Sequence, residues 1–228
     1  MHKKTILALG GATLALAVAS PVALGAGSQV TVRVEGKQRT LLDTKSIHTH
    51  GGFITRGGAP SGTCPATSGA GALDVATKHH WGGNYGSSFG LAVTSILGES
   101  HTFTSNYFWE IFIDNKPATV GACGLSLKRG DALVFAAVPT KGVEYLTAIR
   151  APRSATSGKP FTVKVVRYTG GGVAKPLAGA PVRIGKKSVK TNARGVATVT
   201  ITGTGKVTVH SAPKGEVRAV PVTVRVTG

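Results

Sequence analysis

The sequence is poor in acidic residues and in sulfur. Of its 228 residues, 9 are Asp or Glu against 27 Lys or Arg, 2 are Cys and 1 is Met. The acidic residues stand singly, so they give no paired-carboxylate signature of a glycoside hydrolase. The chain has neither a G-x-S-x-G nucleophile elbow nor a phosphate loop ending in Gly-Lys-Ser/Thr. We therefore expect a protein that is not an enzyme and that carries no cofactor.

Long apolar runs are also scarce, and the one that occurs lies at the N-terminus. There a basic "MHKK" precedes an apolar run that is broken by Gly and Pro and ends in small residues. This order is typical of a secretory signal peptide over residues 1–25, removed near Ala26. A membrane anchor is the alternative. We expect a secreted or cell-surface bacterial protein whose mature chain has no transmembrane segment.

The two cysteines, Cys64 and Cys123, do not form a C-x-x-C pair. Export would place them in an oxidising space, which favours a disulfide between them. Such a bridge would stabilise the fold by about 4 kcal/mol in the chain-entropy description. Two free buried thiols are the alternative.

The positive charge is concentrated in one part of the chain. Residues 26–145 hold 10 basic and 8 acidic side chains, whereas residues 146–228 hold 15 basic side chains and Glu216 alone. The resulting net charge of +14 on residues 146–228 attracts polyanions. We expect anionic envelope polymers as partners and no specific nucleic acid, with a merely solubilising surface as the alternative.

The pattern of apolar residues predicts two domains. Over residues 26–145, an alternating strand at 29–36, further strands at 39–43, 90–98, 107–114 and 132–138, and one helix after Ser68 predict a small α+β domain. Residues 146–160, rich in Pro, Ser and Gly, predict a linker or first strand. Over residues 161–228, six or seven short alternating strands predict an all-β, immunoglobulin-like sandwich with cations on its solvent faces, so the whole chain is mainly β.

Residues 107–135, "YFWEIFIDNKPATVGACGLSLKRGDALVF", have an aromatic strand, a turn, "GACGLSL" and a Gly-Asp before the last strand. Together with "VTVRVEGKQRTLLD" and "GALDVATKHHW" they resemble the transcobalamin C-terminal-like domain over roughly residues 29–140. That resemblance implies a β-grasp-like fold. The helical domain that covers cobalamin in the vitamin carriers has no counterpart here. The strand, turn and "G-x-A" succession after Lys187 resembles bacterial immunoglobulin-like and prealbumin-like domains.

Aromatic side chains supply the candidate site. Trp81 and Tyr85 lie among glycines in "HHWGGNYG", and Tyr107 opens an aromatic strand. Glycines would leave such rings open to a ligand, whereas core packing is the alternative. We take Trp81, Tyr85 and Tyr107 as the candidate contacts for a small ligand or glycan.

Two other patterns have simpler interpretations. The tripeptide Arg129–Asp131 matches an integrin-binding motif, but Gly-Asp between apolar strands is ordinary turn chemistry. His48, His50, His79, His80 and His101 lack metal-site spacing, so we expect no metal site. The sequence thus predicts an exported binding protein with a ligand-recognition domain and a basic tether, or alternatively a purely structural surface protein.

Overall fold

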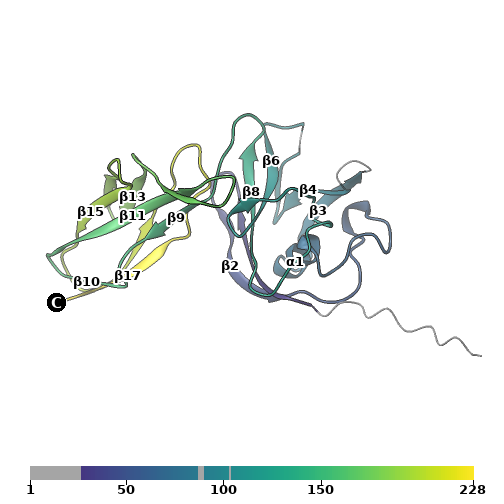
Figure 1. Cartoon of the computed structure of the whole chain (residues 1–228). Coiled ribbons are helices and arrows are strands. Elements are labelled where there is room, and N and C mark those ends of the chain that lie inside the picture. Colours follow the sequence, from purple (N-terminus) through teal and green to yellow (C-terminus); the bar gives the residue numbers. More distant parts are fainter. Residues whose placement is uncertain (1–26, 87–89, 103) are drawn as a thin grey trace, which may run out of the picture.

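The computed structural model describes residues 27–86, 90–102 and 104–228 (Figure 1). The expected signal peptide lies outside these residues. Over these described residues the fold is mainly β, with one α-helix and a short 3-10 turn, η1 (Arg56–Gly58). This confirms the expected fold class. Among the described residues, no helix has the length and apolar character that crossing a membrane would require.

The first domain is built on a mixed sheet in the order β2-β1-β8-β6-β7. Its central strands β1 and β8 are parallel, and every other neighbouring pair is antiparallel. The helix α1 (Gly69–Ala76) packs on one face. This is the β-grasp arrangement, and its strands are β1 (Gln29–Glu35), β2 (Thr40–His48), β6 (Tyr107–Ile113), β7 (Lys116–Pro117) and β8 (Ala132–Pro139).

Helix α1 begins directly after Ser68, as the sequence predicts, and lies unusually close to the preceding chain. A Cβ on Gly71 would come within 1.9 Å of the Ala66 carbonyl oxygen, so only glycine permits this approach. The Ser68 backbone is extended like that of an N-cap, but its side chain makes no capping bond. The helix is therefore positioned mainly by packing.

A second, smaller sheet stands beside the first and has the order β3-β4-β5. It consists of β3 (Trp81–Gly86), β4 (Gly90–Ile96) and β5 (Glu99–Ser100). The sequence did not predict β3, because its glycines indicate a loop. A Cβ on Gly83 would come within 2.7 Å of the Ala92 carbonyl oxygen, so the glycine lets β3 approach β4 closely.

The second domain is a sandwich of two sheets. One has the order β10-β17-β16-β13-β14, and the other has the order β12-β11-β15 with β9 also paired to β11. Buried Val and Ile side chains from both sheets form one core. Its strands are β9 (Thr147–Arg150), β10 (Ser154–Thr156), β11 (Pro160–Tyr168), β12 (Ala174–Pro176), β13 (Pro181–Ile184), β14 (Lys187–Lys190), β15 (Val196–Thr200), β16 (Gly205–His210) and β17 (Val222–Thr227). Residues 146–160, expected to hold a linker or first strand, therefore contain β9 and β10.

The two domains share a small apolar cluster. Phe112 and Val134 on the sheet face opposite α1 pack with Leu146 and Val217 of the second domain. Strand β8 is thus buried on both faces, which explains its nearly continuous apolar sequence "ALVFAAV".

An ion-pair network borders this cluster. The buried Glu35 carboxylate accepts from Arg33 Nη1 at 2.9 Å and from Arg218 Nη1, in the second domain, at 2.7 Å. Arg218 also donates to the backbone carbonyl of Gly36 at 3.0 Å. The hairpin between β1 and β2 is thereby tied to the second domain.

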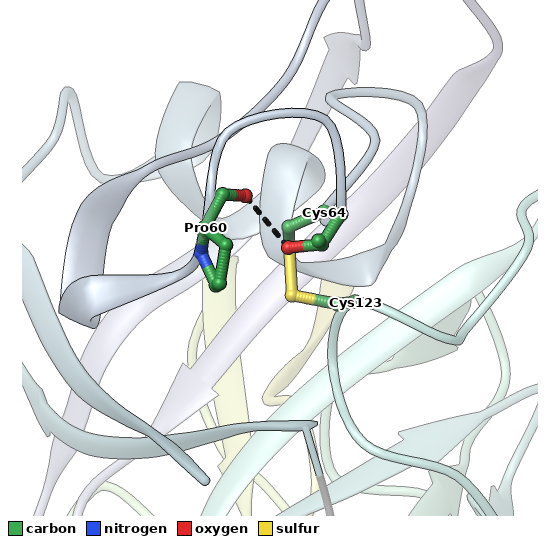
Figure 2. The surroundings of a disulfide bond; sticks show 4 residues. Pro60, Cys64 and Cys123 are labelled. Atoms are coloured by element: carbon green, nitrogen blue, oxygen red, sulfur yellow. Dashed lines mark hydrogen bonds between the residues drawn. A yellow bond between two sulfur atoms is a disulfide. The ribbon is translucent and has the colours of Figure 1, made fainter. Parts of the chain in front are cut away.

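The predicted disulfide between Cys64 and Cys123 is present (Figure 2). It joins the loop before α1, where Pro60 lies, to the segment that follows β7. The two residues are 59 positions apart in sequence. The bridge therefore fixes two loops that flank the helix and the open side of β6.

Candidate functional site

A groove of about 700 Å³ lies between β4 and β6. Tyr85, Leu91 and Val93 of the β3–β4 hairpin line one side, and Trp109 and Ile111 of β6 line the other. The segment 118–124, which contains Cys123, closes the end of the groove. The walls are thus mainly aromatic and aliphatic, as is common in ligand-binding clefts.

The groove exists because two sheet edges meet without pairing. β4 pairs with β3 along its length but with β5 only at Ser95 and Ile96. β6 pairs with β8 along its length but with β7 only at Phe112 and Ile113. The first half of each strand therefore has an open side, and the two open sides border the groove.

The hydrogen-bond ladder shows which backbone groups of β6 face the groove. Asp114 N donates to Ala132 O, and Thr140 N donates to Asn106 O, each at 3.0 Å. In an antiparallel pair every second residue bonds to the partner strand. The even-numbered residues of β6 therefore face β8, and Trp109 directs its backbone N–H and C=O toward the open side.

The neighbours of Trp109 on that side already have partners. Tyr107 N donates to Ser105 Oγ at 3.3 Å, and Ser105 Oγ in turn donates to Tyr107 O. Ala118 N donates to Ile111 O at 2.8 Å. Among the described residues, Trp109 has no such partner, so one residue's donor and acceptor are left for a ligand.

Glu110 supplies the one acidic side chain among the groove's lining residues. Its Oε1 accepts the backbone N–H of Ile111 at 3.2 Å, and no cation of the described chain forms an ion pair with it. Burial raises the pKa of the Glu110 carboxyl, and the bond from Ile111 offsets part of this rise. An unpaired, half-buried carboxylate destabilises a fold, so it calls for a functional explanation.

The three aromatic candidates from the sequence do not come together. Tyr85 is half-buried and lines the groove. Trp81 is 5% exposed, and its Nε1 donates to Asp74 Oδ1 at 2.7 Å. Tyr107 lies outside the groove, with Lys37 Nζ 4.5 Å from its ring centre and His101 beside it.

Asp74 explains the position of Trp81. Its carboxylate lies on α1 and also binds His79 Nδ1 at 2.7 Å, in the turn that follows the helix. Arg56 Nε approaches the same carboxylate at 3.4 Å. Trp81 therefore belongs to a structural hydrogen-bond network. The tryptophan that lines the groove is Trp109.

A second, shallower groove of about 680 Å³ lies on the basic domain, between β9, β10 and β11. Its charged lining residues are Arg150, Lys159 and Lys164, and hydroxyls of Ser154 and Thr162 stand with them. Arg150 and Lys164 are directly opposite across the β9–β11 pair. Like charges opposite one another are unfavourable unless an anion lies between them.

The remaining sequence patterns have structural explanations. The Asp131 carboxylate accepts Lys128 N at 2.7 Å, and Gly130 takes φ 93°, so residues 128–131 form a turn before β8. The strand expected before that turn is reduced to a bridge between Ser68 and Ser126. Within the described ranges, no group of three or more His, Cys, Asp or Glu side chains is placed to hold a metal ion.

A family model described as a domain of unknown function, DUF4430, matches residues 69–138, from α1 through β8. This match covers less than half of the chain and is consistent with the transcobalamin-like resemblance of the first domain. No curated protein matches the chain.

Two solved structures show distant similarity. A Ruminococcus gnavus protein, described as a candidate metal-binding protein, is 14% identical with a TM-score of 0.35, covering 49% of this chain and 97% of its own. The D00–D0 domains of intimin are 16% identical with a TM-score of 0.24, covering 84% of this chain and 95% of their own. At these scores neither similarity bears on the fold or the ligand.

Proposed function

We propose that this chain is an exported, non-enzymatic binding protein of the cell envelope or extracellular space. Its first domain binds a small ligand or a glycan in the groove between β4 and β6. The observation that supports this most is the unpaired edge of β6, where an open donor, an open acceptor and an unpaired carboxylate line an aromatic cavity. A purely structural surface protein would have no need to leave these groups unpaired.

Binding can be tested with Tyr85→Ala, which removes one aromatic wall. We expect any ligand found in screens of glycans and small metabolites to bind this variant at least about fivefold more weakly, as ring contacts in binding sites contribute about 1 kcal/mol or more. Tyr107→Ala is the matched control, because Tyr107 is also half-buried but lies outside the groove. If both variants bind like the unchanged protein, the groove is not the binding site.

The basic domain suggests a second task, attachment to anionic envelope polymers. Two groups of facing cations support this proposal: Arg150 with Lys164, and Lys206 with Arg225. Neither group has an ion-pair partner among the residues described. Glu216, the one acidic residue of this domain, pairs instead with Arg167 at 3.0 Å.

Attachment can be measured as retention on isolated, deproteinised cell wall or on a phosphodiester polymer across a salt gradient. We expect Arg150→Ser with Lys164→Ser to elute at clearly lower salt than the unchanged protein, because binding to polyanions depends on released counterions. Lys128→Ser with Arg129→Ser removes the same charge from an exposed turn of the first domain and serves as the control. If both double variants elute at the same salt concentration, retention depends on net charge alone, which would contradict a specific attachment site.

A further inference from the structure

The open edge of β6 is one residue long, and this length restricts what can pair with it. Tyr107 and Ile111 have their open-side carbonyls occupied, by Ser105 and Ala118. Trp109 alone between them offers both a backbone N–H and a backbone C=O. A residue of an extended peptide presents a matching C=O and N–H on one side of its chain, at the spacing of a strand.

The side chains around Trp109 define the two faces of such a ligand. Trp109 and Ile111 lie on the face of β6 that carries the main core, and Glu110 lies on the opposite face. Successive side chains of an extended peptide also point to opposite faces. A peptide residue paired with Trp109 would therefore direct an apolar side chain toward Tyr85 and Leu91, and its neighbour would lie beside Glu110.

Charge determines what that neighbour should be. Glu110 is half-buried, and the other lining residues of the groove contribute no cation to it. A basic side chain of the ligand would provide the missing counter-charge in a place partly shielded from solvent. An acidic or neutral side chain would leave the carboxylate unpaired.

A third group supports an occupant in this place. The indole Nε1–H of Trp109 is buried, has no hydrogen-bond partner in the described chain, and belongs to a residue that lines the groove. Buried donors of this kind are rare in native structures. A ligand that enters beside Trp109 would add acceptors to its surroundings.

We propose that the groove between β4 and β6 binds a short extended peptide segment, one residue of which exchanges two backbone hydrogen bonds with Trp109 while the adjacent basic side chain pairs with Glu110. This inference rests on the proposed binding function, because it names the ligand class for the same groove. It selects peptides over glycans, since a glycan lacks the fixed backbone donor and acceptor of an extended residue.

The test uses the mature full chain and capped tripeptides with isothermal titration calorimetry. The probe is acetyl-Val-Lys-Val-amide, compared with peptides that carry norleucine or Glu in place of Lys. We expect the Lys peptide to bind about tenfold more tightly than the norleucine peptide, as a charge-assisted hydrogen bond would give. The preference should disappear in Glu110→Gln, which keeps the size of the side chain.

Backbone pairing is tested separately by methylating each peptide nitrogen in turn. Methylation at one position should weaken binding by about threefold to tenfold, and methylation at the others should have little effect. Equal affinity for the Lys and Glu peptides, or insensitivity to every methylation, would overturn the inference, and so would the absence of peptide binding at millimolar concentration. If an oligosaccharide or a free diamine binds in a Tyr85-dependent way and peptides do not, the peptide inference is overturned but the proposed function stands. If no ligand of any class binds in a Tyr85-dependent way, both are overturned.

Discussion

Individual acidic side chains show how this chain uses its few negative charges. Glu35 binds Arg33 and Arg218, and Asp74 binds His79 and the indole of Trp81. Each of these carboxylates holds separate elements together. Glu110 differs because its carboxylate contacts the amide of its own neighbour and otherwise borders the groove.

This difference predicts how Glu110→Gln should change stability with pH. Burial raises the pKa of the folded Glu110 carboxyl above 4.5, so the folded state loses stability relative to the unfolded state as pH rises through that raised pKa. The Gln variant carries no such penalty. We expect its Tm to exceed that of the unchanged protein by about 2–4 °C at pH 8 and to lose this advantage near pH 4. Thermal unfolding followed by circular dichroism at both pH values measures the difference, and equal Tm values at pH 8 would contradict it.

Replacing Asp74 should destabilise the protein, in contrast to replacing Glu110. Asp74→Ala leaves the buried Trp81 Nε1–H and the His79 ring without their acceptor. We expect the free energy of unfolding in urea to fall by about 2–3 kcal/mol at pH 7. Asp43→Ala removes an exposed carboxylate from β2 and should change it by less than about 0.5 kcal/mol. Similar losses in the two variants would show that Asp74 has no special structural role.

Among the secondary-structure elements, the strands with alternating apolar residues could be read from the sequence. β1 and the longer strands of the sandwich follow a period of two, whereas β6 and β8 are short, nearly continuous apolar runs, and both patterns depend on local burial alone. β3 could not be predicted, because its glycines serve the close approach to β4 and this depends on tertiary contact. The same limit applies to the groove. Tyr85 could be named from its glycine neighbours, whereas Trp109 and Glu110 matter because an edge is left unpaired, and no local pattern records which edge that is.

The disulfide allows a prediction about the elements around it. Replacing Cys64 and Cys123 by Ser together should lower the free energy of unfolding by about 4 kcal/mol, because the unfolded chain regains the freedom of a long loop. Urea unfolding of the oxidised protein and of the double variant measures this change. A difference below about 1 kcal/mol would contradict this account and would show that residual structure in the unfolded chain already restricts the loop without the bridge.

For the whole molecule, the contact between the domains is small but includes buried charge. Arg218→Ala would leave Glu35 with Arg33 and the Thr40 hydroxyl as partners and would remove the bonds to the β1–β2 hairpin. We expect the free energy of unfolding of the first domain to fall by about 3 kcal/mol, since breaking a buried ion pair is costly. Its thermal transition should move to a lower temperature. Differential scanning calorimetry measures both domains at once. Arg153→Ala, at an exposed position of the second domain, should leave both transitions in place.

The disulfide also connects the groove to the redox state of its surroundings. Cys123 and the residues on either side of it form the closed end of the groove, and Cys64 holds them from the far loop. Thiols inside a cell are kept reduced, so this wall would be anchored only after the chain reaches an oxidising compartment. For the exported binding protein proposed above, ligand binding would therefore follow export, because formation of the disulfide anchors the end of the groove.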